Sequence, residues 1–192
     1  SVEPLCQEKL QEVSAWHRIF DLMDSPNENV QRWVAASVRP LVSGSTNANL
    51  MHFLLENGII FLLTTLLSSR LTDVQAHALA GLVAILKCGG VPSAPGQDAS
   101  LELSRQVIGV VTDAGGMKLI VDAMKSPDLR VVAQAINLAA LLSLFSSIAR
   151  LLWEEGAIRA VSTFLSEQPT AAIKTVQSGL SVLASLARAG DM

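Results

Sequence analysis

Leucine, alanine and valine recur at spacings of three and four residues along most of the chain, as in Leu79, Leu82, Val83 and Leu86. That spacing places the apolar side chains on one face of an α-helix. No run of the sequence alternates apolar and polar residues for long, as a half-buried β-strand would. The pattern therefore predicts an all-α protein.

Four segments of the chain share one plan, in which a small residue precedes an apolar helix, a polar break and a second apolar helix. They open at Ser14, Gly58, Gly115 and Gly156, and the second helix starts 16 residues after each opening. Successive openings lie 44, 57 and 41 residues apart, and periods of about 40–47 residues are typical of helical solenoids. Each glycine follows the end of an apolar segment, where the chain needs a positive φ that glycine accepts.

A short apolar stretch precedes three of these openings and predicts a further helix, so that each unit has three helices. These stretches are residues 49–55, 105–111 and 147–153. The plan resembles the armadillo repeat family, on the evidence of the sequences at 56–60 (ENGII), 113–117 (DAGGM) and 155–158 (EGAI), each followed by a leucine-rich helix. HEAT repeats are the nearest alternative.

The resemblance implies an all-α, right-handed α-solenoid of about four three-helix armadillo-type repeats. The whole chain, 1–192, is then one repeat domain, with units at roughly 11–43, 48–87, 104–143 and 147–188.

A Gly- and Pro-rich segment from Cys88 to Ser100 is expected to be an inserted loop, tolerated at the surface or contacting a partner. Pro40 is expected to end or kink the third helix of the first unit near Val38 to Arg39. In the Ser-Pro pairs at 25–26 and 126–127, the serine is expected to cap the next helix.

Composition excludes several classes of protein. Of 192 residues, 50% are hydrophobic and 16% are charged, with a net charge of −3. Such a chain is not disordered, and it lacks the clustered Lys and Arg of a nucleic-acid binder.

The two cysteines, Cys6 and Cys88, fit a reducing compartment, and no signal-peptide pattern opens the sequence, so we expect a cytoplasmic protein. The uncharged stretch 131–149 approaches the length of a membrane span, but a buried helix that runs into the next helix explains it better.

No combination of residues in the sequence predicts catalysis, a cofactor or a metal. The three histidines, His17, His52 and His77, fall in three different predicted helices, and no metal-ligand spacing occurs. Asp73 and His77 stand four residues apart and are expected to form an ordinary surface pair. We therefore expect a protein that is not an enzyme.

Solenoids bind partners on the concave face, which the last helix of each unit lines. Counting along these helices places small or neutral polar residues there, with Trp33 as the best anchor and Asn137 as a donor to a peptide backbone. Packing against the next unit is an equally good interpretation of Trp33, and Asn137 has the alternative of bonding its own turn or a buried water. The candidate partner-binding residues are Trp33, His77, Lys87, Gln134, Asn137, Thr175 and Ser178.

The neutral groove differs from what the resemblance implies for two better-known groups. Importin-like armadillo proteins carry repeated Trp and Asn for basic peptides, and catenin-like ones carry Lys and Arg for acidic ligands, whereas these rows hold little of either. The expected function is a protein-interaction scaffold for a neutral or apolar peptide or helix. The alternatives are a regulatory module of a larger protein, acting by autoinhibition or ligand sensing, and a cofactor of an Hsp70-type chaperone.

The last predicted helix, 171–188, carries only Lys174 and Arg188 as charged residues. Terminal repeats need a polar outer face to stay soluble. The sequence therefore predicts an exposed apolar patch at the C-terminal end. Further repeats, self-association or a partner are the three ways of covering it.

Overall fold

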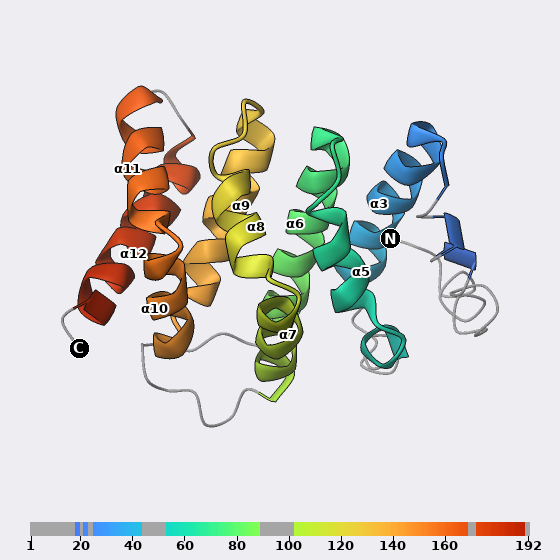
Figure 1. The fold of residues 1–192 in the computed structure, drawn as a ribbon, viewed down its shortest axis with the longest axis horizontal. Coiled ribbons are helices and arrows are strands. Elements are labelled where there is room, and N and C mark those ends of the chain that lie inside the picture. The colour runs from blue at the N-terminus through green and yellow to red at the C-terminus, as the bar shows by residue number, and fades with distance from the viewer. Residues whose placement is uncertain are drawn as a thin grey trace.

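The computed structural model describes residues 18–19, 21–22, 25–43, 53–88, 102–168 and 172–190, and the regular structure there is helical (Figure 1). The helices are α3 (Glu28–Ser43), α5 (Ile59–Leu66), α6 (Thr72–Cys88), α7 (Glu102–Asp113), α8 (Gly116–Ala123), α9 (Leu129–Leu142), α10 (Ser146–Glu154), α11 (Ala157–Glu167) and α12 (Ile173–Gly190). The prediction of an all-α fold is confirmed. Of the predicted loop 88–100, Cys88 instead ends α6, and the rest lies outside the described residues.

Helices α3, α6, α9 and α12 succeed one another along the long axis of the molecule (Figure 1). Each packs on the next, α3 on α6, α6 on α9 and α9 on α12. The shorter helices α5, α8 and α11 each pack on the long helix that follows them in the chain. One apolar core runs without interruption from Val34 to Ala189 through all of these contacts. The architecture is a solenoid of repeated helical units.

Three glycines open the middle helices of the units in the left-handed region of backbone conformation. Gly58 has a φ of 78°, Gly115 of 67° and Gly156 of 87°, and no other described glycine has a positive φ. A Cβ atom is disfavoured there, so only glycine turns the chain sharply from one helix into the next at little cost. The repeated glycine of the sequence therefore marks a repeated corner of the fold, as predicted.

The turns before α3, α6 and α9 share one hydrogen bond, from a backbone N–H to a serine hydroxyl. Ser25, Ser69 and Ser126 each accept at Oγ the backbone N–H two residues later, at 3.2 Å in all three turns. The serines therefore stabilise the turn and do not cap the helix, contrary to the sequence-based expectation. The caps are residues two places further on, Asn27 for α3 and Asp128 for α9, whose side chains accept N–H groups of the first helical turn.

A glutamine closes two of these three turns from within the following helix. Gln31 donates from Nε2 to the carbonyl oxygen of Ser25 at 2.9 Å, and Gln75 donates to that of Ser69 at 2.8 Å. Gln75 also reaches the carbonyl oxygen of Leu67 at 3.2 Å. The matching position in α9 holds Val132, which has no amide to donate. The third turn thus lacks the bond that closes the first two.

Two further sequence-based expectations are settled by the helix boundaries. Helix α3 continues through Pro40 to Ser43 and does not end near Val38. A proline removes only one helical hydrogen bond, while Val34, Ala35 and Val38 bury this helix in the core.

The uncharged stretch 131–149 is divided between α9 and α10, and within the described residues no helix has the length and apolar character needed to cross a membrane.

A matched pair of glycine substitutions tests the packing at the start of α8. A Cβ atom on Gly116 would lie 2.6 Å from Val111 Cγ1 and 2.7 Å from the Val111 carbonyl oxygen, whereas one on Gly109 in α7 meets nothing within 4 Å. We expect Gly116→Ala to lower the free energy of unfolding by about 1–3 kcal/mol. Gly109→Ala should raise it by about 0.5–1 kcal/mol through helix propensity. Urea denaturation followed by circular dichroism measures both, and equal effects of the two changes would contradict this packing.

Candidate functional site

A hollow of about 360 Å³ lies between α6 and α9, on the helices predicted to line the concave face. Its lining residues are Ala80, Val83, Ala84, Lys87 and Cys88 from α6 and Gln134 and Asn137 from α9. The small residues Ala80 and Ala84 leave room between two helices that otherwise pack closely. Three predicted site residues, Lys87, Gln134 and Asn137, therefore share one hollow.

The polar groups of this hollow are amides and one ammonium. Asn137 accepts at Oδ1 a hydrogen bond of 2.8 Å from the hydroxyl of Ser178 on α12. That bond fixes which side of the amide faces the serine, and it leaves the NH₂ group as the donor of Asn137. Lys87 and Cys88 are exposed, Cys88 as a free thiol. Since no carboxylate is among the described residues that line the hollow, it offers mainly hydrogen-bond donors.

The other predicted site residues are spread over the long helices. Trp33 on α3 is 74% exposed, which excludes burial against the neighbouring unit, and it does not line the hollow. His77 on α6 is half-buried. Thr175 on α12 is only 6% exposed, so its assignment to a solvated groove is wrong. Its short side chain is covered because α12 packs directly on α9.

Three other aromatic or histidine residues, Trp16, His17 and His52, lie outside the described residues. The apolar register of Trp153 in the sequence predicts packing in the core or between repeats, but on α10 it is 46% exposed. Helix α10 buries Ile148, Ala149 and Leu152, and Trp153 is one residue past that face. Among the described residues, no group of three or more His, Cys, Asp or Glu side chains is arranged to hold a metal ion.

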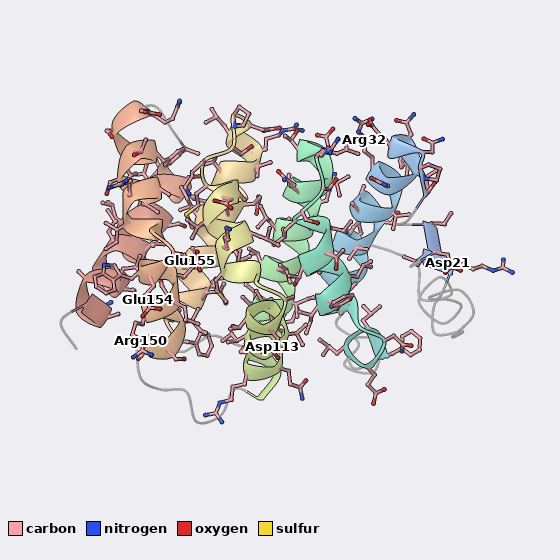
Figure 2. All side chains as sticks on the ribbon, viewed as in Figure 1. Asp21, Arg32, Asp113, Arg150, Glu154 and Glu155 are labelled. Atoms are coloured by element: carbon pink, nitrogen blue, oxygen red, sulfur yellow. The ribbon has the colours of Figure 1, made fainter. Side chains whose placement is uncertain are left out.

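A chain of ion pairs, which we call the charge ladder, joins the first three units. It consists of Arg32, Asp73, Arg130 and Asp128. Asp73 on α6 pairs with Arg32 on α3 at 3.8 Å and with Arg130 on α9 at 2.8 Å, and Arg130 pairs with Asp128 at 2.7 Å. Figure 2 shows Arg32 at the edge of the molecule opposite to Arg150 and Glu154 of α10. The ladder thus runs along one rim of the long helices, at their N-terminal ends.

The charge ladder shifts the pKa values of two of its members, Asp128 and Arg130. Hydrogen bonds from the Arg130 side chain and backbone N–H hold the pKa of Asp128 at about 2, below its ordinary 3.8, and Thr72 on α6 contributes a further bond. The same bonds to Asp128, and then those to Asp73, raise the pKa of Arg130. The four-residue spacing predicts that Asp73 pairs with His77. In the structure Asp73 pairs with two arginines instead. Sequence reasoning missed the ladder because its pairs join different units.

The C-terminal end of the solenoid presents a stripe of α12 that has no helix packed on it in the described chain. The stripe consists of Ile173, Gln177, Leu180 and Ala184, all exposed. The matching positions in α9, 41 residues earlier, are Val132, Ile136, Ala139 and Ser143, all at most 2% exposed. The face that α9 buries is therefore open on α12, as the predicted apolar patch requires.

Comparison with known proteins supports the fold. No protein-family model matches the chain, and no curated protein matches it significantly. Solved structures do match. An engineered protein from the Northeast Structural Genomics Consortium is similar with a TM-score of 0.71 and 19% identity, over 96% of this chain and 68% of that one. A second engineered protein from the same consortium has a TM-score of 0.68 and 19% identity, over 91% and 68%.

A designed armadillo repeat protein in complex with the peptide (KR)₄ is also similar, with a TM-score of 0.50 and 19% identity, over 97% of this chain and 87% of that one. At such identities the likeness concerns the fold alone. It agrees with the order of helices seen here. The chain therefore has a helical repeat fold of the kind found in these engineered and designed armadillo proteins.

The low pKa of Asp128 makes part of the stability of the protein depend on pH. Because the pKa is about 2 in the folded protein and 3.8 ordinarily, the carboxylate stabilises the fold fully above about pH 4, and this stabilisation is lost as the pH falls towards 2. We expect Asp128→Ala to lower the free energy of unfolding by about 1 kcal/mol at pH 6 through the lost helix cap. That difference from the wild type should shrink between pH 4 and pH 2.

Urea denaturation at pH 6, 4, 3 and 2 measures this difference. Asp122→Ala is the matched control, since Asp122 is exposed and pairs only with Lys125 in the described chain. A difference between wild type and Asp128→Ala that is constant over the whole range would show that the carboxylate is not held by Arg130.

Proposed function

We propose that this protein is a non-enzymatic interaction scaffold that binds a neutral or apolar peptide or helix of another protein on the concave face. The observation that carries the proposal is the hollow between α6 and α9, where Lys87, Gln134 and Asn137 come together. The small apolar side chains of Ala80, Val83 and Ala84 lie beside these polar groups, and such a combination suits a ligand-binding site.

The hydrogen-bonding groups of the hollow suit a peptide backbone. With its oxygen engaged by Ser178, Asn137 offers N–H donors to a carbonyl group of the peptide. Gln134 provides both a donor and an acceptor, which match the N–H and C=O groups of an extended chain. The small side chains of Ala80 and Ala84 allow the partner to approach the helices closely.

The charge of the hollow distinguishes the expected partner from the peptide of the designed relative. That peptide, (KR)₄, is strongly cationic. Among the described residues that line the hollow here, the one charged side chain is that of Lys87, which would repel such a peptide. The partner is therefore neutral or apolar, with Lys87 at the edge of the site.

Two alternatives use the same surface differently. A regulatory module would hold a segment of its own longer protein in this hollow, and a chaperone cofactor would hold part of an Hsp70-type chaperone. A scaffold is preferred because the hollow is small and its described lining is neutral apart from Lys87, which suits a short peptide segment. A cytoplasmic location stays a prediction.

We further propose that the open stripe of α12 pairs with the same stripe of a second copy of the chain. The larger side chains, Ile173 and Gln177, lie towards the N-terminus of the stripe, and the small Ala184 lies towards its C-terminus. An antiparallel pairing about Leu180 sets large side chains opposite small ones, which lets two helices pack closely. A two-fold interface of this kind is closed and forms a dimer.

Replacing the two amides of the hollow tests the concave site. Gln134→Ala with Asn137→Ala removes two hydrogen bonds, each worth about 1 kcal/mol, so the double variant should bind peptides at least tenfold more weakly. An array of immobilised neutral, acidic and (KR)₄ peptides measures this, and the neutral peptides should bind best.

Gln106→Ala, an exposed amide on α7, is the matched control and should leave binding unchanged. Trp33→Ala changes a residue on α3 that lies outside the hollow. Weaker peptide binding by this variant would show that the site extends along the concave face as far as α3. Preferential capture of (KR)₄, or equal binding by the wild type and the double variant, would contradict the proposal.

A charge in the α12 stripe tests self-association separately. We expect the wild type to approach twice its mass of 20.4 kDa as its concentration rises. Leu180→Asp should stay at the mass of one chain, because a carboxylate buried at an apolar contact is costly. Light scattering after size exclusion measures both masses. Phe61→Asp, at an exposed site on α5, is the control and should still associate, whereas a wild type that stays at one chain mass would refute the pairing.

A further inference from the structure

A second hollow, of about 780 Å³, lies between the α8–α9 turn and α11. Met124 to Pro127, Leu129 and Val132 form one wall, and α11 with the two residues before it forms much of the other. It shares no lining residue with the hollow between α6 and α9. Over the described residues the two hollows are therefore separate, and a ligand in this one does not depend on the proposed function.

The position of this hollow coincides with the turn that lacks a glutamine. In α6, Gln75 donates to the carbonyl oxygens six and eight residues before it, those of Ser69 and Leu67. The residues at the same distances before Val132 are Ser126 and Met124, and both line the hollow. The serine bond of the turn is the same in both units, so the two turns differ chiefly in the missing amide.

The missing amide leaves two acceptors at the wall of the hollow. Within the described chain, no residue is seen to donate to the carbonyl oxygens of Met124 or Ser126. A planar group with two or more N–H donors, such as a carboxamide or a guanidinium, fits the position that the Gln75 amide takes in the second unit.

The surroundings add to this preference. Glu155 and Glu167 bring two carboxylates to the hollow, and Figure 2 shows Glu155 between α10 and α8 in the view drawn. Lys125, which pairs with Asp122 at 3.1 Å, and Arg159 bring two cations, so the charges of the described lining balance and an uncharged carboxamide suits it as well as a guanidinium does. Leu129, 52% exposed, and Phe164 offer an apolar contact beside the acceptors.

We infer that this hollow is a binding site for a side chain of a partner protein that ends in a planar N–H donor, a guanidinium or a carboxamide, next to an apolar residue. The partner's group takes the place that glutamine occupies in the first two units. It donates to the carbonyl oxygens of Met124 and Ser126, and a guanidinium also pairs with Glu167 or Glu155.

Titration with small probes tests the site without a known partner. The probes are N-acetyl-leucyl-arginine amide and N-acetyl-leucyl-glutamine amide, with N-acetyl-dileucine amide as the apolar control. In ¹H–¹⁵N spectra of the wild type, the first two should shift backbone signals of 124–129 and 156–168, and the control should not. No shift there with either donor probe, or an equal shift with the apolar control, would overturn the inference.

Val132→Gln supplies the missing amide from the chain itself. This variant should weaken binding of both donor probes at least tenfold, and undiminished binding would refute the site. Because Val132 is only 2% exposed, circular dichroism first checks that the variant is folded. Gln75→Val makes the reverse change in the second unit and decides the matter independently. It should create probe-induced shifts at 67–75 that the wild type lacks, and their absence would count against the inference.

Discussion

The structure depends on the apolar contact of each long helix with the next. Helices α6 and α9 bury both of their apolar flanks in this way, since the helices of one unit are too few to enclose a core. Apolar contact is largely non-directional. A sequence can therefore change widely and keep the fold, as long as its small and apolar positions recur with the period of the unit. This explains why engineered and designed proteins at 19% identity share the fold over most of this chain.

The same contact explains why the fold could be predicted and where prediction stopped. The spacing of apolar residues and the repeated glycines follow from local geometry, so the helices, the corners at Gly58, Gly115 and Gly156 and the order of units were predictable. Of the two outcomes expected at Pro40, an end of the helix is wrong, and so is capping by the turn serines, because the local rule was outweighed. Packing of α3 in the core preserves a helix that contains proline, and Asn27 and Asp128 are better placed to cap than the serines before them.

The candidate site was predictable only in part, for a related reason. Counting along the long helices placed Gln134, Asn137 and Lys87 on one surface, and the structure brings them to one hollow. It could not show that Ser178 bonds Asn137, that Thr175 is covered or that Trp153 is exposed, because these depend on the distance between neighbouring helices. The charge ladder and the unfilled third turn likewise become visible only when the units are compared in space.

The charge ladder has a mechanical consequence. Its ion pairs join the first three units at the N-terminal ends of their long helices, and Asp73 alone spans two junctions. Dissolved salt weakens such exposed pairs much more than it weakens apolar contacts. Rising ionic strength is therefore expected to weaken one border of the stack before it weakens the packed middle.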